Sequence, residues 1–173
     1  MQSRERELHQ QLSLYISKGL TKVPELLAAA KIAAYWPIKG EVDIRPALET
    51  FQANGAEIYL PRVTGVNLEF IATPDLRLKD APKGPFGIPY PDGEPQPLSS
   101  VDCVLVPALG FDPEGNRLGR GKGYYDRALG TLNSTPIRIG VGFSDQIVEE
   151  GLNPLPHDVQ MHLVVTEKTI YRF

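Results

Sequence analysis

The sequence predicts a three-layer α/β domain in which a mainly parallel, Rossmann-like sheet is flanked by helices. Two observations carry this prediction. Short apolar runs typical of strands alternate along the chain with segments whose apolar residues recur at helical spacing. The run at residues 101–105 is apolar throughout, as in a strand buried on both faces. In such a sheet, the loops at the carboxyl ends of the strands should build any ligand site.

Two helices and a strand are expected at the start of the chain. Residues 5–18 place apolar side chains at helical spacing, and Gly19 follows as a stop signal. Pro24 suits the first turn of a second helix over residues 24–30. The apolar run at residues 31–36 then predicts the first strand, which ends before a proline.

A third helix and two strands follow. Asp43 is expected to cap a helix that closes at Gly55, and residues 57–60 and 68–72 are expected to form strands. Seven of the chain's 16 prolines then fall within residues 74–97. A connection of this length inside a compact domain is usually functional, so this proline-rich loop either lines a site or is a plain surface excursion.

The C-terminal part of the chain returns to alternating strands and helices. The expected elements are strand 101–105, helix 124–129, strand 137–141, a short helix at 145–150, and strands at 163–166 and 170–172.

Length, charge and cysteine content narrow the class of protein. A chain of 173 residues suits one domain with a substantial core. The net charge is −3 and the cations are scattered, which argues against nucleic acid as a partner. No run approaches the ~20 apolar residues that span a bilayer, so we expect a cytoplasmic protein that binds no membrane. We also expect a monomer. Cys103 lies within an apolar run and is expected to be a buried structural thiol.

Residues 109–127 form the segment richest in chemically useful side chains. Gly119, Gly121 and Gly123 alternate with Arg120 and Lys122. Glycine allows positive φ and close approach to a ligand, while backbone N–H groups, fixed cations and the start of a helix attract phosphate. The segment therefore predicts a cradle for nucleotide phosphates, with a merely flexible turn as the alternative.

Neither standard nucleotide motif fits this segment. The spacing from Gly115 to Gly121 and Lys122 is one residue too long for a Walker A loop, and Gly123 stands where Ser or Thr should hold magnesium. The alternating glycines also differ from the dinucleotide fingerprint G-x-G-x-x-G.

Several motifs together are similar to those of the 5-formyltetrahydrofolate cyclo-ligase family, also called methenyltetrahydrofolate synthetases. The strongest matches are residues 106–112, residues 117–127, and His157-Asp158 ahead of residues 164–166. Further matches lie at residues 32–35, 40–43, 60–63 and 140–143 and at Gln146, and the resemblance runs from about Glu5 to Phe173.

The resemblance implies a single cyclo-ligase domain over residues 1–173 that converts 5-formyltetrahydrofolate, including its polyglutamylated forms, into 5,10-methenyltetrahydrofolate. ATP and Mg²⁺ are the implied cofactors, and ADP and phosphate are released. The implied ATP-binding residues are Arg117, Leu118, Gly119, Arg120, Gly121, Lys122, Gly123, Tyr124 and Tyr125, of which Arg120, Lys122 and Tyr124 are catalytic. Trp36, Glu41 and residues 120–124 would bind folate, and Asp126 and Asp158 would bind magnesium.

Each candidate also has a structural interpretation. Trp36 fits a core position at the end of a strand, and Glu41 fits a solvated loop. Asp126 fits a surface ion pair, and Asp158 fits a turn after a proline.

The chain departs from the family pattern in three places. Family members usually begin with a basic helix that touches the ATP phosphates, and this chain is expected to start after it, with only Arg4 and Arg6 nearby. Tyr90 stands where the family tends to have Glu, and His162 replaces a common aspartate. A second hypothesis is therefore a folate-binding relative with weak or lost turnover. A third hypothesis is a sugar-phosphate enzyme of similar build, which would bind no folate and which Glu41 and Trp36 do not favour.

Overall fold

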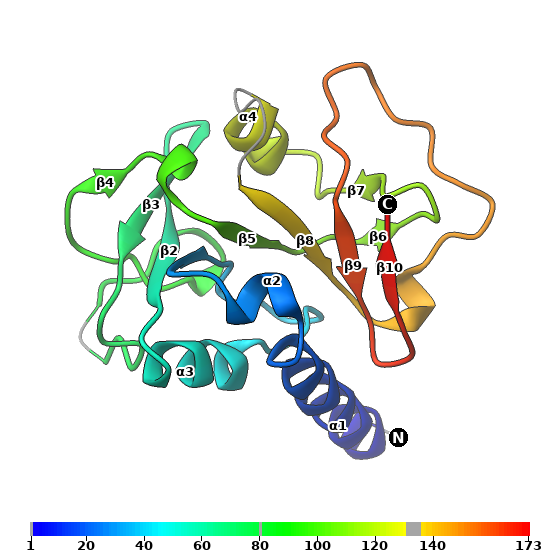
Figure 1. Ribbon diagram of the computed structural model, residues 1–173, viewed down its shortest axis with the longest axis horizontal. Coiled ribbons are helices and arrows are strands. Elements are labelled where there is room, and N and C mark those ends of the chain that lie inside the picture. The colour runs from blue at the N-terminus through cyan, green and yellow to red at the C-terminus, as the bar shows by residue number, and fades with distance from the viewer. Residues whose placement is uncertain (1, 80, 131–135) are drawn as a thin grey trace.

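The computed structural model describes residues 2–79, 81–130 and 136–173 and is built around a large sheet. Its strands are β1 (Lys31–Ala33), β2 (Glu57–Thr64), β3 (Asn67–Ala72), β4 (Pro95–Gln96), β5 (Cys103–Val106), β8 (Ile137–Val141), β9 (Leu163–Val165) and β10 (Ile170–Arg172). They lie in the order β10-β9-β8-β5-β1-β2-β3-β4 (Figure 1). The central strands β9, β8, β5, β1 and β2 are parallel, and β10, β3 and β4 pair antiparallel at the two sides.

Helices and a small second sheet complete the architecture. The helices are α1 (Gln2–Leu20), α2 (Pro24–Leu27), α3 (Arg45–Ala53) and α4 (Tyr124–Gly130), with 3₁₀ turns η1 (Pro85–Gly87), η2 (Leu98–Ser100) and η3 (Ser144–Gln146). Strands β6 (Gly110–Phe111) and β7 (Arg117–Leu118) form a separate antiparallel pair. Of the helices in the described part of the chain, none combines the length and apolar character needed to cross a bilayer.

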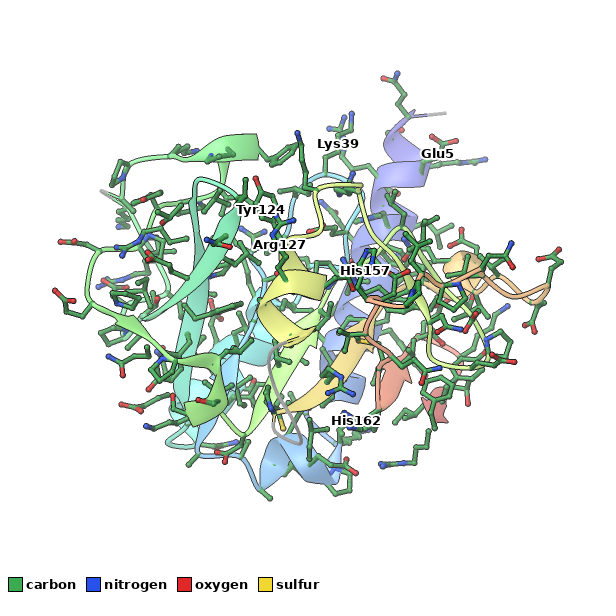
Figure 2. All side chains as sticks on the ribbon, turned by 90° about the horizontal axis from the view of Figure 1, so that it is seen from above. Glu5, Lys39, Tyr124, Arg127, His157 and His162 are labelled. Carbon is green, nitrogen blue, oxygen red and sulfur yellow. The ribbon has the colours of Figure 1, made fainter. Side chains whose placement is uncertain are left out.

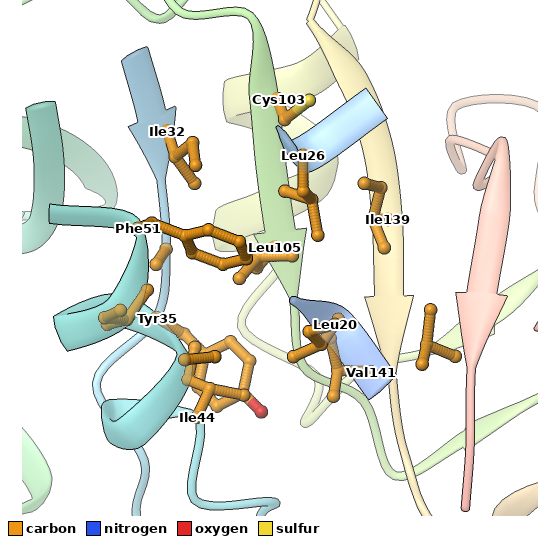
Figure 3. Close-up of a cluster of buried hydrophobic side chains, with 14 of the residues drawn as sticks. Leu20, Leu26, Ile32, Tyr35, Ile44, Phe51, Cys103, Leu105, Ile139 and Val141 are labelled. Atoms are coloured by element: carbon orange, nitrogen blue, oxygen red, sulfur yellow. The ribbon is translucent and has the colours of Figure 1, made fainter. Parts of the chain in front are cut away.

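Two apolar clusters cover the two faces of the large sheet. Alternate residues along a strand point to opposite faces. Ile32 and Leu105 pack with α1–α3 in the cluster of Figure 3, whereas Ala33 and Val104 pack with Leu129 of α4 on the other side. Helices therefore lie on both faces, and the prediction of a three-layer, mainly parallel α/β fold is confirmed.

The connections out of β1 and β5 run in opposite directions across the sheet. From β1 the chain passes through α3 to β2, and from β5 it passes through α4 to β8 on the other side. Parallel crossovers are right-handed, so opposite directions put α3 and α4 on opposite faces. The carboxyl ends of β1 and β5 consequently lie beside a gap between diverging connections, where open α/β sheets bind ligands.

Three local expectations were wrong. The helix after Pro24 stops at Leu27, because the Asp102 carboxylate accepts the N–H groups of residues 30 and 31 and draws the chain into β1. Asp43 is not the N-cap of α3. The N-cap is Ile44, one residue after the expected position, and the Asp43 carboxylate accepts the N–H of Arg45, the first residue of the helix.

The helix expected at residues 145–150 is only the 3₁₀ turn η3. Its continuation is prevented because Val148 donates its backbone N–H to the carbonyl of Phe111 at 2.7 Å. The expected strands at 57–60 and 68–72 also prove to be one antiparallel hairpin, in which β2 continues to Thr64 and Gly65 turns with φ +61°.

Asp112 ties the β6–β7 turn, which leads into the glycine-rich segment, to a distant loop. Its buried carboxylate accepts the backbone N–H groups of Glu114, Asn116 and Leu152, and also the Asn116 side-chain amide, at 2.9 Å each. Burial raises the pKa of Asp112, but the hydrogen bonds outweigh it, and the net pKa is lowered.

We expect Asp112→Asn to reduce the free energy of unfolding by about 2 kcal/mol at neutral pH, because an amide –NH₂ would face N–H donors. A carboxyl group whose pKa is lower in the folded than in the unfolded protein stabilises the fold at pH values above its unfolded-state pKa. That stabilisation is lost as the pH falls through the folded-state pKa. In urea titrations, the difference between the two proteins should therefore shrink below about pH 4. A difference independent of pH would contradict an ionised Asp112.

Gly140 in β8 is expected to tolerate no side chain. A Cβ there would lie 2.5 Å from Cε1 of the buried Phe111 and 3.1 Å from Cγ2 of Val164. We expect Gly140→Ala to destabilise the protein by about 1–3 kcal/mol in denaturant titrations, the usual cost of overpacking. Gly19→Ala is the matched control: nothing lies within 4 Å of its Cβ position in α1, so it should be neutral or stabilising.

Candidate functional site

A cavity of about 370 Å³ opens at the carboxyl ends of β1 and β5. Tyr35 and Trp36 line it just after β1, and Pro107 and Ala108 line it just after β5. Its volume falls in the range of small-molecule sites. The cavity lies at the edge of the sheet where the sequence predicts a ligand site.

The predicted site residues all line this cavity. They are Trp36, Glu41, Arg117, Leu118, Gly119, Arg120, Gly121, Lys122, Gly123, Tyr124, Tyr125, Asp126 and Asp158. The fold thus brings together three segments that are far apart in the sequence. The proline-rich loop also contributes wall residues between Gly84 and Tyr90, which favours the interpretation that it lines a site over that of a plain surface excursion.

The glycine-rich loop needs glycine for two reasons, positive φ and close packing against a side chain of the protein. Gly121 and Gly123 have φ of +91° and +68°. A Cβ on Gly119 would lie 3.1 Å from Nη2 of Arg117, so the loop passes directly against that side chain. Within the described residues, the backbone N–H groups of residues 119–123 donate to no protein acceptor. They remain available to a ligand.

Arg117 is buried beneath this loop. Its side chain is 8% exposed, its Nε donates to the Pro107 carbonyl at 2.9 Å, and its guanidinium lies 5.2 Å from the Tyr125 ring centroid. Nη1 is 3.9 Å from Oδ2 of Asp126. Burial lowers the pKa of Arg117, and the charge of Asp126 opposes that effect. Arg117 therefore organises the loop from below, whereas Arg120 is half exposed above it.

Glu41 presents a largely buried carboxylate to the cavity. Oε2 accepts the N–H of Ile38 at 3.0 Å, and Oε1 is 3.8 Å from Nε of Arg120. Burial raises the pKa of Glu41, although the hydrogen bond from Ile38 and the charges of Arg120 and Arg117 act against it. The carboxylate keeps acceptor capacity for a ligand.

Residues that sequence reasoning missed hold the loop of Glu41 in place. The Tyr35 hydroxyl donates to the Val42 carbonyl at 2.8 Å. Ser13 of α1 accepts the N–H of Asp43 at 3.1 Å, and the Ser17 hydroxyl donates to the Asp43 carbonyl at 3.2 Å. The sequence does carry a signal for these contacts, because two serines lie four residues apart on the apolar face of the first helix.

Aromatic rings with a cation on one face also border the cavity. The guanidinium of Arg127 lies 5.5 Å from the ring centroid of Tyr124, and the two are seen side by side in Figure 2. The guanidinium of Arg45 lies 5.6 Å from the Trp36 ring centroid. Such rings offer flat apolar surface to a planar ligand. His162 lies well away from Tyr124 in Figure 2, and its Nδ1 accepts the N–H of Arg138, a structural role.

Asp126 and Asp158 both line the cavity, and the negative charge of each acts to raise the pKa of Arg117. Asp126 accepts the N–H of Val159 at 3.3 Å, and Asp158 accepts that of Leu155 at 2.8 Å, so each carboxylate retains free lone pairs. No group of three or more acidic, His or Cys side chains suited to a metal is found among the described residues. Two carboxylates nevertheless match what proteins commonly offer Mg²⁺, whose other ligands are waters and phosphates.

Comparison with known proteins bears on this geometry. The profile of the 5-formyltetrahydrofolate cyclo-ligase family matches residues 1–167. The 5-formyltetrahydrofolate cyclo-ligase of Mycolicibacterium smegmatis is 33% identical over 82% of this chain and 76% of its own length. The structure of 5,10-methenyltetrahydrofolate synthetase from Aquifex aeolicus superposes with a TM-score of 0.82 at 36% identity, over 96% of this chain and 83% of that one. The synthetase from Mycoplasma pneumoniae gives 0.73 at 27% identity, over 92% and 87%. The chain belongs to the 5-formyltetrahydrofolate cyclo-ligase family.

Proposed function

We propose that this protein is an ATP-dependent ligase that cyclises 5-formyltetrahydrofolate to 5,10-methenyltetrahydrofolate and releases ADP and phosphate. One observation carries the proposal. A single cavity joins an apolar and aromatic wall, a buried carboxylate and a cationic glycine-rich loop, the parts needed to hold a pterin beside a triphosphate. The names of the related proteins support it. We propose that residues 1–173 act as one monomeric domain, on polyglutamylated substrates as well.

The triphosphate of ATP is proposed to lie along residues 119–123. The unpaired N–H groups of this loop supply donors, and Arg120 and Lys122 supply positive charge. Arg117 keeps the loop in shape from below, and Leu118 and Tyr125 form adjoining wall.

The folate is proposed to lie against Glu41. An ionised carboxylate can accept two N–H bonds from the aminopyrimidine edge of a pterin, which a neutral amide cannot. Trp36 and Tyr124 supply flat surface for the rings, and their cavity positions allow it. Arg120 is close enough to Glu41 to border both ligands.

The chemistry explains why ATP is required. N5 donates electrons into the formyl carbonyl, which makes its carbon a poor electrophile. Transfer of the γ-phosphoryl group to the formyl oxygen forms an O–P bond, breaks the bond to ADP and creates a leaving group. N10 then bonds to the formyl carbon and loses its proton, and phosphate departs with the oxygen. Arg120, Lys122 and Tyr124 are proposed to position the reactants and stabilise charge during these steps.

Asp126 and Asp158 are the residues proposed to hold Mg²⁺, with nucleotide phosphates and waters as its other ligands. When bound, the ion would neutralise charge on the phosphates. Asp126 lies in the first turn of α4, which directly follows the phosphate loop.

The direct test is to mix protein, Mg²⁺, ATP and 5-formyltetrahydrofolate and to follow methenyl absorbance. We expect ATP-dependent product. For Lys122→Met we expect kcat to fall by a factor of about 10²–10³, because the negative charge on the transferred phosphoryl group loses the lysine cation that stabilises it. Lys168→Met, which changes an exposed lysine outside the cavity, should leave kcat unchanged. Calorimetric folate binding without any turnover would instead identify a folate-binding relative.

Glu41→Gln should raise KM for 5-formyltetrahydrofolate at least about tenfold, the loss expected for a hydrogen bond to a charged group. Because burial raises the pKa of Glu41, wild-type affinity should fall with decreasing pH before an ordinary glutamate would protonate. The variant should lack that pH dependence. Glu49→Gln, at an exposed position on α3, is the control. Identical pH profiles for wild type and Glu41→Gln would refute this role.

A further inference from the structure

Arg62 of β2 lines the cavity but belongs to none of the proposed binding groups. Its side chain is 15% exposed and pairs across the β2–β3 hairpin with Glu69. Nε and Nη2 of Arg62 donate to Oε2 of Glu69 at 3.2 and 3.0 Å. Nη1 donates to the carbonyls of Pro91 and Gly93 at 3.3 and 3.1 Å. The guanidinium also lies 5.4 Å from the ring centroid of Tyr90.

These contacts attach a segment that is otherwise closed on itself. Residues 82–90, which we call the rim hairpin, are joined internally by hydrogen bonds from Gly84 to Ile88 and from Tyr90 to Pro82, at 2.8 and 2.6 Å. Among the described residues, the only hydrogen bonds between residues 82–93 and the rest of the protein come from Arg62. The hydrogen bonds that attach the rim hairpin to the rest of the protein thus come from one side chain and lie at Pro91 and Gly93, just after the hairpin.

The rim hairpin forms an apolar part of the cavity wall. Pro85, Ile88 and Pro89 line the cavity together with Val63 and Leu68 of the β2–β3 hairpin. Apolar surface of this kind can pack on the rings of a folate but offers nothing to phosphates. The position of the rim hairpin should therefore affect binding of the organic substrate and leave the nucleotide almost untouched.

Arg62 is not placed to bind an anionic ligand itself. A guanidinium has five N–H donors, and four of them are engaged by Glu69, Pro91 and Gly93. Glu69 also accepts the Thr64 hydroxyl at 3.0 Å, which fixes the carboxylate in turn. The planar fork of arginine meets a carboxylate and two carbonyls at once, a geometry that lysine cannot reproduce.

We propose that Arg62, oriented by Glu69, is a positioning residue that holds the rim hairpin as the folate-facing wall of the cavity. The inference rests on the proposed cyclo-ligase function for its substrate. Its structural part, the attachment of residues 82–93, stands independently of turnover.

The kinetic test compares Arg62→Met, Arg62→Lys and Glu69→Gln with wild type. For Arg62→Met we expect KM for 5-formyltetrahydrofolate to rise about tenfold, equivalent to about 1.4 kcal/mol, with kcat at saturation and KM for ATP within about twofold of wild type. Arg62→Lys and Glu69→Gln should give smaller rises in the same constant. Arg77→Met is the matched control, because Arg77 also pairs with a carboxylate but does not line this cavity.

Limited trypsin digestion gives a readout that needs no activity. Lys83 is the only lysine or arginine in residues 81–99 and lies in the rim hairpin. Cleavage after Lys83, identified by fragment mass, should be faster in Arg62→Met than in wild type or Arg77→Met at equal thermal stability. If Arg62→Met does not fold, Arg62→Lys and Glu69→Gln carry the same comparison.

Two results would overturn the proposal: unchanged cleavage after Lys83 in the folded variants, or a loss of kcat with no selective rise in KM for the folate. A wild-type protein that lacks cyclo-ligase activity would contradict the proposed function instead, and the digestion would still test the attachment.

Discussion

The site depends on one arginine that the fold removes from water. Arg117 bonds to the carbonyl at the end of β5, packs on Tyr125 and lies beside Asp126, while the glycine-rich loop crosses over it at Gly119. A buried cation is costly unless its donors are paired, so these partners are constrained together. Strand end, loop and α4 consequently keep a fixed relation, and the loop can offer its N–H groups without first being ordered.

The fold gathers its polar side chains at one edge of the sheet. The two apolar clusters leave the faces of the sheet covered, so the ends of the strands are where polar side chains can gather. Diverging connections from β1 and β5 open the gap, and the loop that carries Glu41 also lines the cavity there. The catalytic proposal thus follows from topology as much as from any single motif.

The sequence predicted the features that local physics determines. Alternating apolar patterns located the parallel strands. Glycines alternating with Arg120 and Lys122 located the loop, because tolerance of positive φ is a property of glycine itself. Contacts between distant segments could not be read in this way. The pairing of Arg62 with the carbonyls of Pro91 and Gly93, or of Ser13 and Ser17 with the loop of Glu41, depends on which elements become neighbours. The helix expected at residues 145–150 does not form for the same reason, because the carbonyl of Phe111 accepts the backbone N–H of Val148.

The two outer strands of the sheet have a consequence for the behaviour of the protein at high concentration. β4 has two residues and β10 has three, so each exposes only a few free backbone donors and acceptors. Long unpaired edges template strand addition and aggregation, whereas short edges give a second chain little to pair with. The long strand β2, which could have served as such a template, is enclosed between β1 and β3. The β10 side of the sheet therefore offers a second chain little to pair with, whereas on the other side β4 pairs only with Phe70 and Ile71 of the six-residue β3.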